Sequence, residues 1–250
     1  SFEPDMLPLS VISFQKNSKL SSILSSRAFS RVIWGNNNTC EYFKALNTPL
    51  KCLDLYFHDR SSACILNANS LLLSDSTQID LLAKKLSLDI LTFNQYACSS
   101  PKLLLIYAPL ITDGIVKVLS ALFKRISFHA LSISSLSESS AIDKFKVLAD
   151  LSYSVNGLEL ILDSDLLSAI STPQAKLPNL SLLHSGVLHY SYISDLTQLS
   201  LYLDSSFQTL VHYGFSSEDK SVLLNMCIDQ GIDRLIDPGQ ALNISNIWDG

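Results

Sequence analysis

One cysteine of the 250-residue chain stands where a thiol could act as a nucleophile. In FNQYACSSP (93–101), Cys98 follows a segment of helical pattern and precedes the apolar run KLLLIY. Pro101 lacks a backbone donor and restricts Ser100 to extended angles, so we expect Cys98 in a loop that leads into a strand. Such loops carry ligands in α/β proteins. The alternative is a small buried side chain, which most free cysteines are and which the local pattern favours.

The other four thiols are expected to have structural roles only: Cys40, Cys52, Cys64 and Cys227. Five cysteines are an odd number, their spacings are wide, and no CxxC pair occurs, which argues against a disulfide framework and against a zinc site. Reduced thiols of this kind are typical of a cytosolic protein. We therefore expect the chain in the cytoplasm and without a bound metal.

A second candidate site is the turn in WGNNNT, where Gly35, Asn36 and Asn37 follow a predicted strand and begin a helix. Backbone N–H groups at a helix N-terminus can bind a phosphate. A single glycine does not make the GxGxxG fingerprint of dinucleotide binding. The local pattern therefore favours a tight turn with an N-cap.

The histidines show no spacing of a paired metal site, and each is expected to be structural: His58, His129, His184, His189 and His212. The sequence contains no GxSxG, P-loop or HExxH motif, and no pair of carboxylates indicates acid–base chemistry. Cys98 is therefore the residue with the best claim to chemistry.

The composition excludes some classes of protein. Hydrophobic residues make up 47% of the chain and charged residues only 16%, against roughly 25% charged in an average chain, so part of the surface is expected to pack against other protein. A net charge of −5 gives no basic patch for nucleic acid. The most apolar stretch, 103–111, is shorter than the roughly 20 residues of a membrane span, and SFEPDMLPLS is no signal peptide. With no initiator Met, the chain is expected to be a piece of a longer protein.

Predicted strands alternate with predicted helices along the chain, which indicates an α/β fold with a largely parallel sheet. Strands are expected at 9–14, 31–34, 50–57, 62–68, 102–107, 158–163 and 188–193. Helices are expected at 19–26, 35–46, 76–92, 113–126, 139–153, 195–205 and 217–230.

Three stretches together resemble one protein family: RVIWGNNN, FNQYACSSP and the C-terminal GIDRLIDPGQALNISNIWDG. They are similar to the long-chain acyl-CoA reductases, the fatty acid reductase subunits that supply aldehyde to bacterial luciferase, and their non-luminous relatives. The similarity runs over about 31–250. This family is in turn similar to the aldehyde dehydrogenases, which implies an aldehyde-dehydrogenase-like fold: a catalytic domain and the end of a Rossmann-type cofactor domain.

The resemblance also implies a domain organisation. Residues 1–55 would be the last part of an incomplete dinucleotide-binding domain, residues 56–238 the catalytic cysteine domain, and residues 239–250 a return segment towards the cofactor domain. Gly35, Asn36 and Asn37 would lie against NADPH. Family members are roughly twice this length, so most of the cofactor domain would precede residue 1.

The resemblance implies that the Cys98 thiolate attacks a long-chain acyl-CoA, or an acyl group from a donor protein, and that NADPH reduces the acyl-enzyme to a fatty aldehyde. The backbone N–H of Cys98 would stabilise the oxyanion. Aldehyde dehydrogenases have a catalytic glutamate at about the position of Tyr56, and no Glu stands nearby. Without that general base, the acyl group would wait for hydride rather than be hydrolysed.

Two alternatives remain open. The first is a cysteine acyltransferase or thioesterase that uses no nicotinamide, and the second is a non-catalytic interaction module. Expected partners are a second copy of the chain or other fatty acid reductase subunits, with no nucleic acid and no membrane span.

Overall fold

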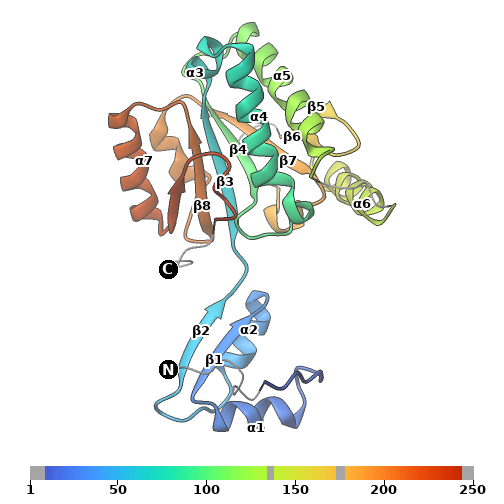
Figure 1. Ribbon diagram of the computed structural model, residues 1–250, viewed down its shortest axis with the longest axis vertical. Coiled ribbons are helices and arrows are strands. Elements are labelled where there is room, and N and C mark those ends of the chain that lie inside the picture. The colour runs from blue at the N-terminus through green and yellow to red at the C-terminus, as the bar shows by residue number, and fades with distance from the viewer. Residues whose placement is uncertain (1–8, 134–137, 173–177, 244–250) are drawn as a thin grey trace. The chain divides into compact units, whose positions relative to one another are not determined.

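The computed structural model describes residues 9–133, 138–172 and 178–243. The chain divides into two compact units, Ser1–Asp59 and Arg60–Gly250 (Figure 1). The assignment of residues 1–55 to a cofactor domain stays a prediction. So does the return segment 239–250, of which residues 244–250 lie outside the described residues.

The smaller unit is a helix–strand repeat, with α1 (Lys19–Arg27), β1 (Ser30–Trp34), α2 (Asn37–Lys44) and β2 (Leu53–Phe57). The strands β1 and β2 pair in parallel, with Ser30 opposite Leu53 and Trp34 opposite Phe57. Successive side chains of a strand point to opposite faces of a sheet. The two faces of this small sheet therefore differ in composition.

One face of the small sheet carries a partly buried ion pair. Arg31 donates from Nε to Asp54 Oδ1 at 2.7 Å and from Nη2 to Asp54 Oδ2 at 2.5 Å. Its Nη1 donates to the carbonyl of Phe43 in α2 at 3.0 Å, and the Tyr56 hydroxyl donates to Asp54 Oδ2 at 2.6 Å. These hydrogen bonds, led by that from Arg31, hold the pKa of the Asp54 carboxyl well below its usual range.

The opposite face of the small sheet is apolar and exposed. Its side chains come from alternate positions of both strands: Val32, Trp34, Leu53 and Leu55, all more than half exposed. Trp34 stacks on Phe57 with 4.9 Å between ring centroids. A sheet face of this composition is usually covered in a folded protein, because exposed apolar area is unfavourable in water.

The larger unit is built on a seven-stranded sheet in the order β5-β6-β7-β4-β3-β8-β9. The strands are β3 (Ser61–Asn67), β4 (Pro101–Tyr107), β5 (Glu159–Asp163), β6 (Ser168–Ser171), β7 (Val187–Ile193), β8 (Phe207–Tyr213) and β9 (Arg234–Ile236). All neighbours are parallel except β5, which runs antiparallel to β6 at one edge. The central strands β3 and β4 are almost completely buried, as the apolar run of β4 indicates.

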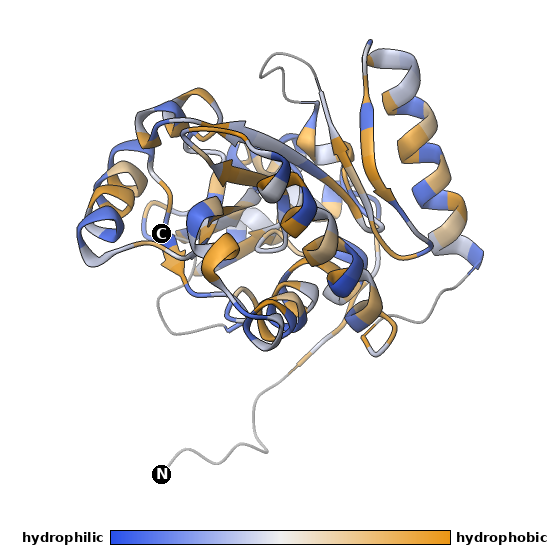
Figure 2. Cartoon of the chain, turned by 90° about the horizontal axis from the view of Figure 1, so that it is seen from above, coloured by the Kyte–Doolittle hydropathy of each residue, from blue (hydrophilic) through white to orange (hydrophobic). Residues whose placement is uncertain are grey.

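Helices cover both faces of this sheet (Figure 1). One face packs against α3 (Ala68–Leu73), α4 (Ser76–Leu91) and α5 (Asp113–Ala130), and the other against the 3-10 helix η4 (Leu196–Leu201) and α7 (Ser217–Gln230). The helix α6 (Glu138–Ser154) packs on a third cluster that includes residues of β6 and β7. Figure 2 shows hydrophilic and hydrophobic residues on the same helices, as expected of helices with one buried face.

The helix α4 positions the region before Cys98. Asp75 accepts from the N–H groups of Thr77 and Gln78, and the Gln78 side chain accepts from the N–H of Asp75, which is a capping box. Leu86 and Ile90 are fully buried against the sheet. The predicted helix 76–92 is thus confirmed, and its end leads directly into the candidate site.

Several sequence-based expectations were wrong. Residues 9–14 form no strand, since among the described residues no strand pairs with them, and Leu9 and Val11 are almost fully exposed. The expected helix at 195–205 is the short 3-10 helix η4. The elements α3, β6 and β8 were not predicted as such. Within the described residues, no helix is long and apolar enough to cross a membrane.

We predict that Asp54→Asn destabilises the smaller unit by about 1–2 kcal/mol, because it weakens a charged hydrogen-bond network. The folded pKa of Asp54 is lowered, so its contribution to stability is fully present above the unfolded value of about 3.9 and is lost as the pH falls further. Hydrogen exchange of residues 30–57 across this acid range measures the effect.

Glu41→Gln is the matched control, because Glu41 is exposed on α2 and its removal deletes one negative charge away from Arg31. The control should keep the acid dependence of the wild-type chain. An equal acid dependence in Asp54→Asn and wild type would contradict the assignment.

Candidate active site

Cys98 lies in the loop between the 3-10 helix η2 (Thr92–Gln95) and β4. It is half-buried, whereas Ser99 and Ser100 are buried. The hydroxyl of Ser62, at the start of β3, donates to the Cys98 carbonyl at 2.8 Å. The loop was correctly expected to adjoin a strand, but it lies at the amino end of β4, whereas ligands of open α/β sheets usually bind beyond the carboxyl ends.

The backbone before Cys98 is left-handed over three consecutive residues. Phe93, Asn94 and Gln95 have φ values of 54°, 53° and 66°. Asn adopts this conformation more readily than most residues, whereas for Phe and Gln it is strained. Such strain persists only where the surroundings hold the backbone, and it is often found at functional sites.

The side chain of Gln95 is one of the groups that hold this turn. Gln95 is fully buried, its Nε2 donates to the carbonyl of Pro101 at 3.1 Å, and its Oε1 accepts from the N–H of Gly186 at 3.2 Å. One amide therefore joins the turn to the start of β4 and to the segment before β7. In the sequence, Cys98 lies between Gln95 and Pro101, which the first of these hydrogen bonds joins.

A second left-handed turn supports the first. Ser185 and Gly186 have φ values of 55° and 81°, and the N–H of Ser185 donates to the carbonyl of Asn94 at 2.9 Å. A Cβ on Gly186 would lie 1.9 Å from the Leu166 carbonyl oxygen, so this position requires glycine.

Tyr96 and His184 add a ring contact across the two turns. Their ring centroids are 4.8 Å apart with an interplanar angle of 20°, and the Tyr96 hydroxyl lies 3.2 Å from His184 Nδ1. Burial lowers the pKa of His184, while Asp143 acts in the opposite direction. The imidazole is therefore neutral at neutral pH and serves as a packing and hydrogen-bonding group.

Another loop of the larger unit is held by two opposite charges. Asp89, a buried residue of α4, accepts from the N–H groups of Gly239 at 2.6 Å and Ala241 at 2.9 Å. Arg234 of β9 donates to the carbonyls of Ala241 and Gln240, each at 3.1 Å. Burial raises the pKa of Asp89, while its hydrogen bonds to the loop and the charge of Arg234 lower it.

Arg234 also lies within electrostatic reach of Cys98. Burial lowers the pKa of the guanidinium, while the negative charges of Asp89 and of Cys98 raise it. The interaction is mutual, so a cation near Cys98 favours the thiolate over the thiol.

The turn at Gly35, Asn36 and Asn37 belongs to the smaller unit and is built as a tight turn with an N-cap. Asn36 Oδ1 accepts from the N–H of Thr39 at 2.9 Å, and a Cβ on Gly35 would lie 2.9 Å from Thr39 Cγ2. The N–H of Asn37 donates to Asp59 Oδ2 at 3.1 Å, and that of Gly35 to the Phe57 carbonyl. These N–H groups and the Asp59 charge do not suit a phosphate at this turn.

A cavity of about 320 Å³ in the same unit is a better fit for part of a cofactor. Its lining is mainly apolar and aromatic, and includes Leu24, Val32, Trp34 and Phe43. The polar members of the lining are Ser21, Ser25, Arg31 and Thr39. A lining of this kind suits a flat ring rather than a charged group. The cavity is thus the part of this unit whose lining suits the ring of a nucleotide, whereas N–H groups of the Gly35 turn already have partners within the unit.

The buried histidine His189 has a structural setting. Its Nε2 lies 3.0 Å from the Thr172 hydroxyl, and burial lowers its pKa to about 4, so it is neutral at neutral pH. The five cysteines are free thiols. Across 9–133, 138–172 and 178–243, no group of three or more His, Cys, Asp or Glu side chains could hold a metal ion.

The fold is that of the aldehyde dehydrogenases. A C291A mutant of aldehyde dehydrogenase C from Pseudomonas syringae, complexed with NAD+ and octanal, matches 92% of this chain with 48% of its own length, a TM-score of 0.59 and 9% identity. Methylmalonate-semialdehyde dehydrogenase from Oceanimonas doudoroffii matches 90% with 48% of its length, a TM-score of 0.61 and 8% identity. The NADP-dependent glyceraldehyde-3-phosphate dehydrogenase from Bacillus halodurans, complexed with NADP, matches 87% with 46%, a TM-score of 0.55 and 12% identity.

The chain spans about half the length of these dehydrogenases. Residues 6–250 match the family described as acyl-CoA reductase (LuxC), and the chain belongs to that family. None of the curated proteins gives a significant match. Family and fold confirm the resemblance inferred from the three sequence stretches.

Sequence reasoning did not find three residues that shape this site: Asp89, Gln95 and Arg234. A signal existed for Asp89, because the helical period places this carboxylate beside Leu86 and Ile90 on the buried face. Arg234 was noted only as part of a resembling stretch. Gln95 carries no local signal, because its role depends on the segment around Gly186, far away in sequence.

We predict that Gln95→Ala destabilises the larger unit, because it leaves the Pro101 carbonyl and the Gly186 N–H without a side-chain partner. Each buried group left unpaired costs about 1–3 kcal/mol. Chemical denaturation of the full chain measures the loss.

Gln78→Ala is the control, because Gln78 also bonds a backbone N–H but is exposed at the start of α4. Its loss should stay below about 1 kcal/mol. Similar losses of stability in the two variants would contradict the role of Gln95 in holding the turn.

Proposed function

We propose that the chain carries the cysteine-containing part of an acyl-CoA reductase that converts a long-chain acyl-CoA to a fatty aldehyde with NADPH. The observation that supports this most directly is the strained left-handed turn that leads into the loop of half-buried Cys98, a residue whose negative charge interacts with the cation Arg234. Family membership supplies the reaction type. The length of the acyl chain and the choice of NADPH are parts of the proposal.

In the first step, the Cys98 thiolate attacks the carbonyl carbon of the acyl-CoA thioester. The oxyanion then collapses, the bond to the CoA sulfur breaks, and CoA leaves as a thiolate while the acyl group stays on Cys98. The backbone N–H of Cys98 is the proposed donor to the oxyanion. Because the turn at 93–95 fixes the loop, the attacking sulfur needs little reorganisation.

When bound, the reduced nicotinamide supplies a hydride to the acyl carbon. The tasks of this chain are then to exclude hydrolysis and to release the aldehyde with Cys98 as the leaving thiolate. The strand expected to carry the glutamate of aldehyde dehydrogenases is β2, with Tyr56 at about that position and Asp54 as its one carboxylate. Arg31 and Tyr56 engage Asp54 and lower its pKa, which makes it a poor general base.

The cofactor would be held in part by the cavity that Leu24, Val32, Trp34 and Phe43 line. The segment Gly35, Asn36 and Asn37 stays a proposed cofactor-binding segment, although its N–H groups have partners of their own. The exposed apolar face of β1 and β2 supports the proposal that further protein completes the enzyme. We propose that this is further chain of the same protein, with a second copy or other reductase subunits as partners in the cytoplasm.

We predict that incubation with a long-chain acyl-CoA adds one acyl group to the chain and that peptide mass spectrometry locates it on Cys98. Cys98→Ala should abolish the label, because no other thiol has this setting. Cys52→Ala is the control, since Cys52 is a partly exposed thiol in the smaller unit, and it should label like the wild type.

Equal labelling of Cys98→Ala and wild type would refute the assignment of the nucleophile. Aldehyde formation that requires NADPH, in a protein extended upstream of residue 1, separates a reductase from an acyltransferase or thioesterase. Turnover without NADPH would favour those alternatives.

A further inference from the structure

A row of polar residues crosses the sheet at the edge where Cys98 lies. Arg234 of β9 is opposite Thr209 of β8, and Thr209 is opposite Ser62 of β3. Adjacent strands are about 4.8 Å apart, so the row joins three neighbouring strands at one level. It ends at Cys98, because the Ser62 hydroxyl donates to the Cys98 carbonyl.

This row lies on the face of the sheet that α4 covers. Side chains two residues apart on a strand share a face, and Cys64, Val211 and Ile236 all pack in the cluster that contains the buried residues of α4. Ser62, Thr209 and Arg234 each stand two residues before one of these. Arg234 is therefore on the same side of the sheet as Asp89, which is consistent with their shared loop.

The row is polar although it is buried. Ser62 and Thr209 are fully buried, and Thr209 Oγ1 has no hydrogen-bond partner among the described residues. A buried hydroxyl without a partner is unfavourable, whereas a valine of similar shape would pack here without this cost. The polarity of this row thus exceeds what packing of the sheet requires.

The guanidinium of Arg234 is fixed by its contacts. It donates to the carbonyls of Ala241, Gln240 and Asn243 at 3.1, 3.1 and 3.3 Å. Asp89 holds the same loop through the N–H groups of Gly239 and Ala241. A loop bound through its carbonyls on one side and its N–H groups on the other has little freedom, and neither has the arginine.

We propose that Arg234 is a positioning residue for Cys98: held by the 239–243 loop and by Asp89, it keeps a fixed positive charge near the sulfur and so favours the thiolate. The proposal rests on the proposed role of Cys98 as the nucleophile. Arg234 itself touches no reacting atom. Its effect is on the fraction of Cys98 that is ready to attack.

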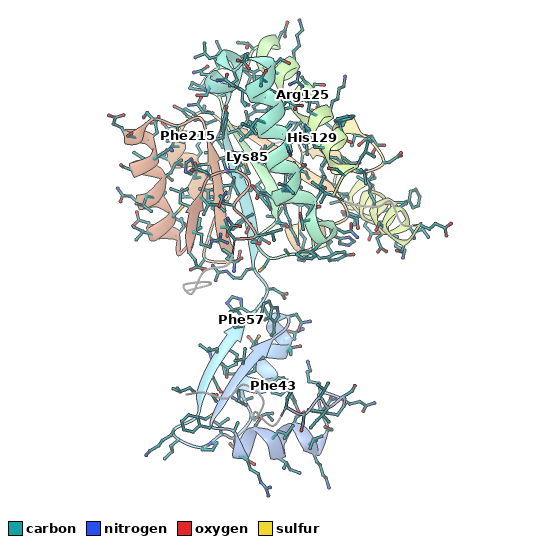
Figure 3. All side chains as sticks on the ribbon, in the orientation of Figure 1. Phe43, Phe57, Lys85, Arg125, His129 and Phe215 are labelled. Atoms are coloured by element: carbon teal, nitrogen blue, oxygen red, sulfur yellow. The ribbon has the colours of Figure 1, made fainter. Side chains whose placement is uncertain are left out.

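Several other charged groups lie near Arg234. The carboxylate of Asp89 opposes the charge of Arg234, and two backbone N–H groups of the 239–243 loop hold it in place. Figure 3 shows Lys85 on α4, where its side chain lies close to Gly239. Other charged or titratable groups on neighbouring elements include Cys64 of β3, Arg60 with Asp233, Lys102, and Tyr96 with His184.

The test is the pH dependence of Cys98 alkylation by iodoacetamide in the full chain, read on the Cys98 peptide by mass spectrometry. In wild type we expect a midpoint below the unperturbed value of about 8.5. Arg234→Gln should raise this midpoint by about one pH unit, because removing a nearby cation disfavours the thiolate. Arg234→Lys keeps the charge and should restore most of the shift.

Arg125→Gln is the matched control. Arg125, labelled on α5 in Figure 3, also binds a backbone carbonyl, that of Ser76. Ser76 begins the 16-residue helix α4, whereas Asp89 is near its end, about 20 Å away at 1.5 Å per residue. The control variant should alkylate like the wild type.

An unchanged midpoint in Arg234→Gln, or an equal shift in Arg125→Gln, would overturn the proposal. If Arg234→Gln does not fold, the wild type and Arg234→Lys test the proposal. A wild-type alkylation midpoint at about 8.5 or above would refute the proposal. So would an Arg234→Lys midpoint that is a full pH unit above that of the wild type. A different result would contradict the proposed function: a Cys98 that has a low alkylation midpoint but accepts no acyl group from acyl-CoA.

Discussion

The candidate site depends on one amide side chain. Gln95 bonds the start of β4 with its nitrogen and the segment before β7 with its oxygen, and it does so from a backbone conformation that its own residue type disfavours. The strain in the 93–95 turn and the two buried hydrogen bonds are therefore linked. The hydrogen bonds stabilise the strained backbone, and the turn sets the position of the loop that contains Cys98. The glycine at 186 is needed for the same reason, since its N–H must approach Gln95 where a side chain would collide with Leu166.

Two loops meet the sheet at the Cys98 edge, and each is fixed in a different way. The loop that contains Cys98 is held by neutral hydrogen bonds and by the Tyr96–His184 ring contact. The 239–243 loop is held by the opposite charges of Asp89 and Arg234. Neutral contacts change little with pH or salt, whereas charges also act at a distance, on a neighbouring sulfur. This division fits a nucleophile that must be rigidly placed and also ionised.

The sequence predicted those elements whose patterns are local. The helix α4 follows from its apolar period, and β4 follows from its apolar run between Pro101 and Tyr107. The strand β8 escaped because Gln208, Thr209 and His212 interrupt its apolar residues although the strand is buried on both faces. The expected strand at 9–14 failed for the opposite reason: its composition suits a strand, but pairing needs a neighbour that composition does not reveal. The role of Cys98 was suggested by resemblance, whereas the contacts of Gln95, Asp89 and Arg234 arise only from folding.

The small sheet of β1 and β2 has a consequence for handling the protein. Two strands are too few for independent stability in water, and within the described residues each of these strands has one edge without a neighbouring strand. The charged residues of these strands, Arg31 and Asp54, are occupied with each other and do not guard those edges. Open edges beside an exposed apolar face favour pairing between molecules. Aggregation of the chain produced by itself should therefore begin in its first 59 residues, however well the cysteine unit folds.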